Sequence, residues 1–197
     1  MASFLVRDVE VALDAKTWPS GKIPKTLVSA SGVISIDVGA ALHLLGNLTM
    51  PNIISPASPA LFWAYLRYYL APSSHADLRV TMDFSDLDPH QKGILSDDFG
   101  VAIATQWMSD KIGPFTQIVD GRRFANQFTR LMRKKHDSKA KVGTSKAPDY
   151  IMKDTAGKWH VLECKGTQSD RSYQRSVLKT ARAQKHAIQL LGSIKGE

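Results

Sequence analysis

Two short apolar stretches of APDYIMKDTAGKWHVLECKGT, residues 147–167, include three charged residues whose types and spacing could do chemistry. Asp149 opens the stretch DYIMK, and Glu163 and Lys165 lie near the end of KWHVLECKG. The residues DTAG between the stretches are typical of a turn, so the stretches read as the two strands of a hairpin. Because alternate residues of a strand share a face, Glu163 and Lys165 point to the same side.

The register of this hairpin decides whether the two carboxylates meet. A four-residue loop over DTAG pairs Lys153 with Lys158 and sets Asp149 opposite Leu162. A bulge, or a shift of one residue, sets Asp149 opposite Glu163 instead, where facing side chains lie about 5 Å apart. We expect the second register if the hairpin carries a site; the alternative is an ordinary exposed hairpin with three charges.

Paired carboxylates on one side of the hairpin would have a defined chemistry. Two carboxylates this close repel each other, and a cation between them relieves the repulsion. Mg²⁺ prefers oxygen ligands and takes one or two protein carboxylates, with water and phosphate as the rest. Asp149 and Glu163 thus suit Mg²⁺ or Mn²⁺ holding a phosphodiester, and Lys165 is placed to orient water or offset phosphate charge.

The residues Pro148-Asp149 and Glu163-Cys164-Lys165 resemble the motif of the PD-(D/E)XK nuclease superfamily, which includes restriction enzymes, recombination nucleases and junction resolvases. The resemblance implies a core of one helix, the motif hairpin, a second helix and usually one further strand. It also implies that the Asp and the acidic residue of the triplet bind metal and that the Lys is catalytic. These roles carry over to Asp149, Glu163 and Lys165.

The helices that flank the hairpin add candidates by the same resemblance. Many members have an acidic residue on the preceding helix, followed three positions later by a small residue. Asp97 with Gly100 fits this spacing, and Asp98 with Val101 fits it less well, so Asp97 is the preferred metal ligand. Some members carry Gln on the following helix, with Tyr four residues on. Gln184 matches this Gln, but the residue four positions later, at 188, is Ile and not Tyr. The sequence therefore departs here from the pattern of the recombination-nuclease subgroup.

The charge of the chain, a net +8, is unevenly distributed. Residues 122–197 contain 18 Lys and Arg and 6 Asp and Glu, whereas residues 1–121 contain 8 and 12. A basic half favours a polyanionic partner, with nucleic acid ahead of a membrane surface; the alternative is a merely solvated basic surface. The resemblance implies DNA as the partner, with RNA less favoured. The residues expected to bind nucleic acid are Arg122, Arg123, Arg130, Lys134, Lys135, Lys179 and Arg182.

Apolar periodicity and breakers predict an α/β fold, with a mixed β-sheet flanked by helices. We expect an N-terminal α/β section of unassigned role over residues 1–95 and a restriction-endonuclease-like core over 96–197, whose last strand has no obvious sequence. The predicted strands are 4–13, 26–38, 76–87, 115–121, 149–153 and 158–166. The predicted helices are 39–48, 58–70, one N-capped by Ser96, a basic one over 122–135, and 172–191.

Cysteine usage and hydropathy give the expected compartment. Cys164 is the single cysteine, so no internal disulfide forms, and alternation places it opposite the charged face as a packed thiol. No apolar run approaches the roughly 18 residues that span a bilayer. We therefore expect a cytoplasmic protein. The resemblance implies a metal-dependent DNA endonuclease, and a non-catalytic nucleic-acid-binding module and a structure-specific resolvase are the alternatives. Duplex cleavage would suggest a homodimer, and a larger protein or complex is the alternative source of the missing last strand.

Overall fold

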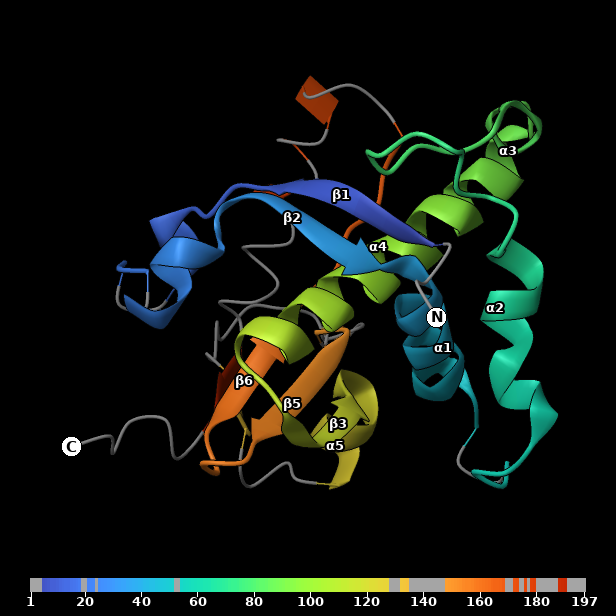
Figure 1. Cartoon of the computed structure of the whole chain (residues 1–197). Helices are drawn as coiled ribbons and strands as arrows, with labels where there is room; N and C mark the ends of the chain where they lie inside the picture. The colour runs from blue at the N-terminus through green and yellow to red at the C-terminus, as the bar shows by residue number, and fades with distance from the viewer. Residues whose placement is uncertain are drawn as a thin grey trace. The chain divides into compact units, whose positions relative to one another are not determined.

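The computed structural model describes residues 5–18, 21–23, 25–51, 54–127, 132–134, 148–168, 172–173, 176, 178–179 and 188–190. It divides into two compact units (Figure 1). Unit 1 comprises Met1–Lys111 with Gly166–Gln168, and unit 2 comprises Ile112–Lys165 with Ser169–Glu197.

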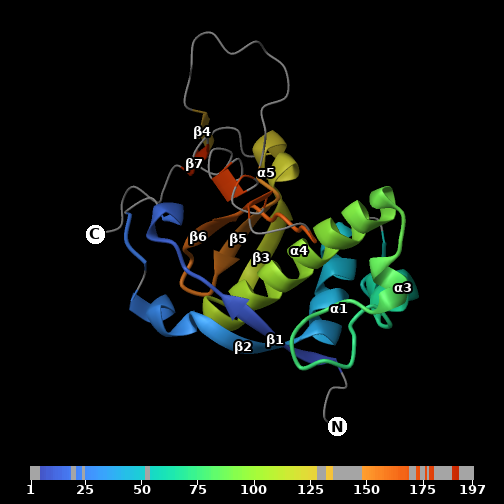
Figure 2. The ribbon, with the colours of Figure 1, turned by 90° about the horizontal axis from the view of Figure 1, so that it is seen from above.

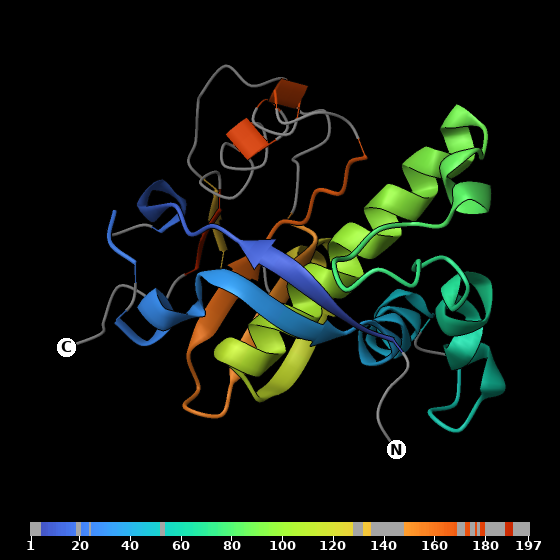
Figure 3. The same cartoon turned by 45° about the horizontal axis from the view of Figure 1, so that its top comes forward.

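Unit 1 contains a two-stranded antiparallel sheet. β1 (Val6–Val11) pairs with β2 (Gly32–Asp37), and the two strands run side by side in Figure 3. Backbone hydrogen bonds join Asp8 of β1 to Ala76 and Leu78, so a loop segment continues the pairing on the other edge of β1. The remaining elements of unit 1 are the short 3₁₀ helices η1 (Ala15–Thr17), η2 (Lys25–Ala30) and η3 (Pro59–Phe62) and the helices α1 (Val38–Thr49), α2 (Trp63–Tyr68), α3 (Met82–Ser85) and α4 (Pro89–Lys111).

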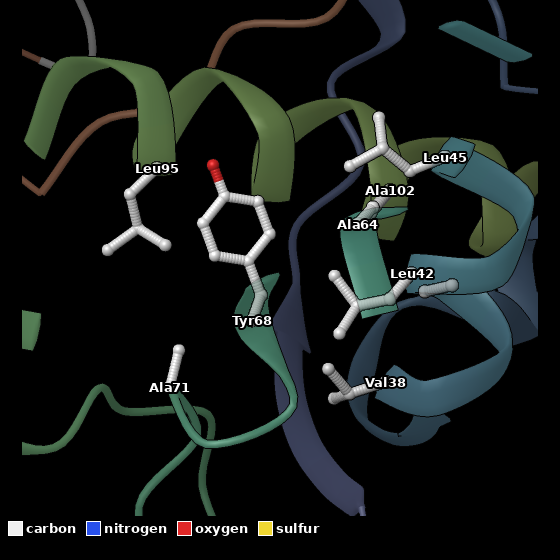
Figure 4. Packing of buried hydrophobic residues seen from close by; sticks show 9 residues of the cluster. Val38, Leu42, Leu45, Ala64, Tyr68, Ala71, Leu95 and Ala102 are labelled. Atoms are coloured by element: carbon white, nitrogen blue, oxygen red, sulfur yellow. The ribbon is translucent and has the colours of Figure 1, made fainter. Parts of the chain in front are cut away.

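The core of unit 1 is formed by one face of α1 against α2 and α4 (Figure 4). α1 is capped by Asp37, whose carboxylate accepts a hydrogen bond from the N–H of Ala40 at 3.1 Å. Gly46 is required in this helix because a Cβ there would overlap the backbone oxygen of Leu61. The buried residues of α1 recur at one-, three- and four-residue steps, as a core-facing stripe does: Val38, Ala41, Leu42, Leu45 and Gly46.

The N-terminus of α4 differs from the sequence prediction. The sequence predicts Ser96 as the N-cap, but Ser96 lies inside the helix, where its hydroxyl donates to the carbonyl of Lys92 at 2.7 Å. The helix begins at Pro89, and the Asp88 carboxylate accepts the N–H of His90 at 2.9 Å. Asp followed by Pro is the stronger start, since Asp caps free N–H groups and Pro brings none of its own. The expected boundary after residue 95 therefore falls inside α4.

Unit 2 contains an antiparallel sheet in the order β3 (Phe115–Asp120), β5 (Tyr150–Asp154), β6 (Trp159–Leu162), seen in Figure 2. α5 (Gly121–Gln127) follows β3 directly. Asp120 caps it, because its carboxylate accepts the N–H groups of the next two arginines, each at 2.9 Å.

One face of this sheet is closed by α5. Phe124 of α5 is 2% exposed and packs on Ile151 of β5, which is fully buried. The Phe124 ring also meets the Trp159 ring of β6 edge-on, with 5.2 Å between centroids. Phe124 is therefore a core residue, and it anchors α5 on the hairpin that carries the charged residues.

The α/β class is confirmed, but a mixed sheet is not found. The named strands pair antiparallel, and parallel pairing among the described residues is confined to an isolated bridge between Asp8 and Asp77. The restriction-endonuclease-like core stays a prediction.

Four predicted elements are wrong in part. Residues 82–85 of the predicted strand 76–87 form α3, and the first half of the predicted strand 26–38 is η2. Of the basic helix predicted over 122–135, residues 122–127 belong to α5 (Gly121–Gln127), whereas Met132–Lys134 forms β4. β4 pairs with β7 (Ile188–Leu190), a segment predicted to be helical. Local periodicity does not reveal such a pairing between segments distant in sequence.

Among the described residues, no helix has both the length and the apolar content needed to cross a bilayer.

Candidate metal centre on the β5–β6 hairpin

The turn between β5 and β6 contains three loop residues, one fewer than DTAG predicts. The N–H of Asp154 donates to the carbonyl of Lys158 at 3.0 Å, and the N–H of Gly157 donates to the carbonyl of Asp154 at 3.0 Å. Gly157 has a φ of +80°, which glycine adopts without strain. A three-residue loop that ends on a left-handed glycine is a common hairpin connection.

This turn sets the register that a site requires. The observed pairs are Tyr150 with Leu162, Ile151 with Val161, Met152 with His160 and Lys153 with Trp159. The four-residue loop and its register, which paired Lys153 with Lys158, are therefore corrected by one residue. Continued one pair beyond the last observed pair, the register sets Asp149 opposite Glu163, on the side that Lys165 shares.

Asp149 is held in place by its backbone and by one oxygen of its side chain. The preceding Pro148 is fully buried against Gly121, where a Cβ would overlap the carbonyl of Pro148. The N–H of Gly121 donates to the carbonyl of Asp149 at 3.0 Å. The Asp149 Oδ2 accepts the N–H of Cys164 at 2.7 Å. The side chain is 35% exposed, so it is fixed on one side and open to solvent on the other.

Glu163 is the most deeply buried charge of the group. Its side chain is 3% exposed, and Oε1 accepts a hydrogen bond from Lys165 Nζ at 2.5 Å. Oε2 is also buried, and it finds no hydrogen-bond partner in the described part of the chain. An unpartnered buried oxygen of this kind costs about 1–3 kcal/mol, and more when charged. A cation at Oε2 would remove that cost.

Lys165 links the two carboxylates. Its Nζ lies 2.5 Å from Glu163 Oε1 and 4.0 Å from Asp149 Oδ2. Partial desolvation lowers the pKa of Lys165, but the hydrogen bond to Glu163 and the negative charges of Asp149 and Glu163 outweigh it, so the pKa lies above its ordinary value. In this arrangement Lys165 is an ammonium group that neutralises the carboxylates.

The donor set fits Mg²⁺ or Mn²⁺. Asp149 and Glu163 supply hard oxygens, and Glu163 Oε2 has no partner in the part of the chain that the structure describes. Two protein carboxylates are enough for Mg²⁺ when water and phosphate complete the shell. No cluster of three or more His, Cys, Asp or Glu side chains suited to a metal occurs in the described residues. Asp149 and Glu163 are therefore the carboxylates of the hairpin that could hold such a cation.

Asp97 and Asp98 lie on α4, in unit 1. The Tyr68 hydroxyl donates to Asp98 Oδ2 at 2.5 Å, so this carboxylate has a partner within its own unit. Desolvation raises the pKa of Asp98, although the Tyr68 hydrogen bond and the nearby Arg67 oppose the shift. Asp97 is exposed. These environments favour Asp97 over Asp98 as a ligand, and a role for either beside the hairpin stays a prediction.

Of the predicted nucleic-acid contacts, Arg122 and Arg123 are the best defined. Both are exposed on α5, directly after the glycine that contacts Asp149. Lys179 is also exposed, in a helical segment of unit 2. Lys134 lies in β4, and its side chain is not among those described. The remaining predicted contacts and the predicted catalytic glutamine lie outside the described residues: Arg130, Lys135, Arg182 and Gln184.

Cys164 is a packed thiol, as the sequence predicts. It is 6% exposed, and burial followed by the neighbouring carboxylates of Asp149 and Glu163 raises its pKa. A protonated buried thiol is a poor nucleophile.

Two residues of this region were not singled out by sequence reasoning. Gly121 fixes the backbone of Asp149, and Asp154 organises the turn. The pairs Asp120-Gly121 and Asp154 with Gly157 carry the signal, since Asp and Gly together are typical of tight backbone geometry.

Comparison of the chain with protein-family models, with curated proteins and with solved structures finds no match.

Proposed function

We propose that this protein is a Mg²⁺-dependent nuclease that hydrolyses phosphodiester bonds of DNA. The proposal is carried by the environment of Glu163, a buried carboxylate on the same hairpin end as Asp149 and Lys165, with one oxygen that has no partner among the described residues. A metal ligand needs an acceptor oxygen that is not already hydrogen-bonded, and Glu163 Oε2 meets this condition among the described residues. The resemblance of these residues to the PD-(D/E)XK motif supports the same assignment.

The charge of the surrounding chain supports a polyanionic substrate. The exposed side chains of Arg122 and Arg123 follow Gly121, whose N–H contacts the backbone of Asp149. Arginine binds phosphate through planar paired donors, and such contacts position a nucleic-acid backbone without reading its sequence. The net charge of residues 122–197 adds to this attraction.

Each residue of the hairpin site has a distinct role in this proposal. When bound, Mg²⁺ supplies Lewis acidity, which lowers the pKa of water and offsets charge on phosphate oxygens. Asp149 and Glu163 would hold the ion. Lys165 would donate hydrogen bonds as an ammonium group, neutralising Glu163 and then the negative charge that develops on the phosphate. Gln184 is the expected further contact.

A cleavage assay tests the proposal. Supercoiled plasmid, linear duplex, branched DNA and single-stranded RNA are incubated with the full chain in Mg²⁺, Mn²⁺ or EDTA. We expect DNA cleavage that requires metal. Lys165→Ala should slow it by about 10²–10³-fold, the effect of losing one donor that stabilises developing charge. Lys158→Ala is the matched control, since Lys158 is an exposed lysine of the same hairpin.

Each alternative corresponds to its own result. DNA binding without cleavage in either metal would identify a non-catalytic binding module. Cleavage confined to branched substrates would identify a resolvase. Cleavage that persists in EDTA, or that is equal in Lys165→Ala and wild type, would refute the mechanism. Gel filtration with and without DNA tests the expected dimer.

A further inference from the structure

A second polar cluster lies at the turn of the β5–β6 hairpin. One oxygen of Asp154 accepts the N–H of Lys158 at 2.8 Å, and the other lies 2.8 Å from His160 Nε2. The Asp154 and His160 side chains are 13% and 15% exposed. The His160 ring also packs edge-on against Phe115 of β3, with 5.7 Å between centroids. Asp154 therefore ties the last residue of β5 to the turn and to β6.

Gly157 completes this turn. Its φ of +80° is one that residues with a Cβ rarely adopt, and its N–H donates to the Asp154 carbonyl at 3.0 Å. The Asp154 N–H in turn donates to the Lys158 carbonyl at 3.0 Å. Side chain and backbone of Asp154 thus bind the same residue, and they select a loop of residues 155–157 over the four-residue loop that pairs Lys153 with Lys158.

Loop length at the turn determines the geometry at the opposite end of the hairpin. With three loop residues, Asp149 lies opposite Glu163. With four, Asp149 lies opposite Leu162, and Glu163 then points to the other face from Asp149, because a slip of one residue exchanges the faces. The paired carboxylates therefore depend on bonds made several residues away.

We propose that Asp154 and Gly157 are positioning residues, which hold the hairpin in the register that brings Asp149 beside Glu163. This inference rests on the proposed function for its consequence in metal binding. Neither residue belongs to the predicted metal ligands, so both act through the register alone. The Asp154 side chain is specific for this role because its two oxygens bind two different partners, the Lys158 backbone and the His160 ring.

The test measures Mn²⁺ affinity by calorimetry and the register by nuclear Overhauser effects between Ile151 and Val161. We expect Asp154→Ala and Gly157→Val to weaken Mn²⁺ binding by about tenfold or more, because a slipped register separates the two carboxylates and even the loss of an outer-shell partner costs that much. Asp154→Asn keeps an oxygen acceptor, and Gly157→Asn tolerates positive φ, so both should bind Mn²⁺ nearly as wild type. Thr155→Ala, in the same loop, is the control and should match wild type.

The register measurement separates this inference from the proposed function. Wild type that binds no Mn²⁺ would refute the metal site, and the Overhauser effects of Asp154→Ala would still decide the positioning role. Folded Asp154→Ala with unchanged Ile151–Val161 contacts and unchanged Mn²⁺ affinity would overturn the inference. If Gly157→Val does not fold, the comparison of Asp154→Ala with Asp154→Asn, in Mn²⁺ affinity and in Ile151–Val161 contacts, tests the inference by itself.

Discussion

Two partly or fully buried carboxylates, one in each unit, have opposite environments. Asp98 of unit 1 accepts a hydrogen bond from the Tyr68 hydroxyl at 2.5 Å and lies beside the apolar cluster of α1, α2 and α4. Glu163 of unit 2 is 3% exposed, binds Lys165 through one oxygen and leaves the other without a partner in the described residues. The neutral phenol gives Asp98 one donor, and desolvation still raises the pKa of Asp98.

The difference shows how a structural carboxylate is distinguished from a ligand. Asp98 is joined to a core tyrosine, and this bond ties α2 to α4. Glu163 keeps acceptor capacity that no described neighbour uses, beside a second carboxylate and an ammonium group. Burial alone does not separate the two cases; the unpartnered oxygen does.

The largest expected effect is on metal binding by Glu163→Gln. Outer-shell partners of metal ligands are worth about 10–100-fold in affinity, so loss of a direct carboxylate ligand should exceed the upper figure. Mn²⁺ titration calorimetry measures it, and DNA cleavage should fall in parallel. Lys158→Ala serves as the control at the same hairpin. Equal Mn²⁺ affinity in Glu163→Gln and wild type would show that Glu163 is not a metal ligand, and the proposed difference from the structural carboxylate Asp98 would be lost.

Added metal should stabilise the wild type. A ligand that binds the folded state alone adds about 2.7 kcal/mol to the unfolding free energy at 100 times its Kd. Thermal unfolding with and without Mg²⁺ measures this as a rise in Tm. The rise should vanish in Glu163→Gln and persist in Tyr69→Phe, a change at an exposed residue of unit 1. A rise of equal size in Glu163→Gln would place the ion elsewhere.

Tyr68→Phe tests the structural half of the comparison. The change removes the hydroxyl that binds Asp98 and leaves a half-buried carboxylate with one donor fewer. We expect the unfolding free energy to fall by about 1–3 kcal/mol, measured by urea denaturation. Tyr69→Phe is the matched control, since Tyr69 is 43% exposed. Equal stability of the two variants would show that the Tyr68 bond contributes nothing.

The sequence predicts the hairpin site better than the elements around it. Alternation along the strands places Glu163 and Lys165 on one side, and only the register needed the structure to decide it. Loop length depends on the φ of Gly157 and on two hydrogen bonds of Asp154, and neither follows from periodicity.

Long-range pairing and competing start signals explain the other differences. β4 and β7 form by pairing with each other across more than fifty residues, so neither segment shows its strand character locally. The predicted start of α4 differs from the observed one because Ser96 and Asp88 both precede apolar residues at helical spacing. Asp88-Pro89 is the stronger signal, and it moves Asp97 and Asp98 from the first turn into the helix interior.

The smallest effect expected is a pH dependence of opposite sign at two aspartates. Desolvation raises the pKa of Asp98 above the ordinary value of 3.8, so its contribution to stability is full below that pH and is lost as pH rises through the raised pKa. The hydrogen bond with His160 lowers the pKa of Asp154, so its contribution is present above pH 3.8 and is lost as pH falls through the lowered pKa.

Substitution by Asn separates the two contributions. On acidification, Asp154→Asn should lose less unfolding free energy than wild type, because it has no carboxylate to protonate at the turn. Asp98→Asn should lose more, because the folded wild type takes up a proton at Asp98 more readily than the unfolded chain does. Urea denaturation of the three proteins from neutral pH to below pH 3.8 gives the two difference profiles. Each variant controls for the acid response of the rest of the chain, which the two variants share. Differences from wild type that have the same sign in both variants would contradict the opposite environments of the two carboxylates.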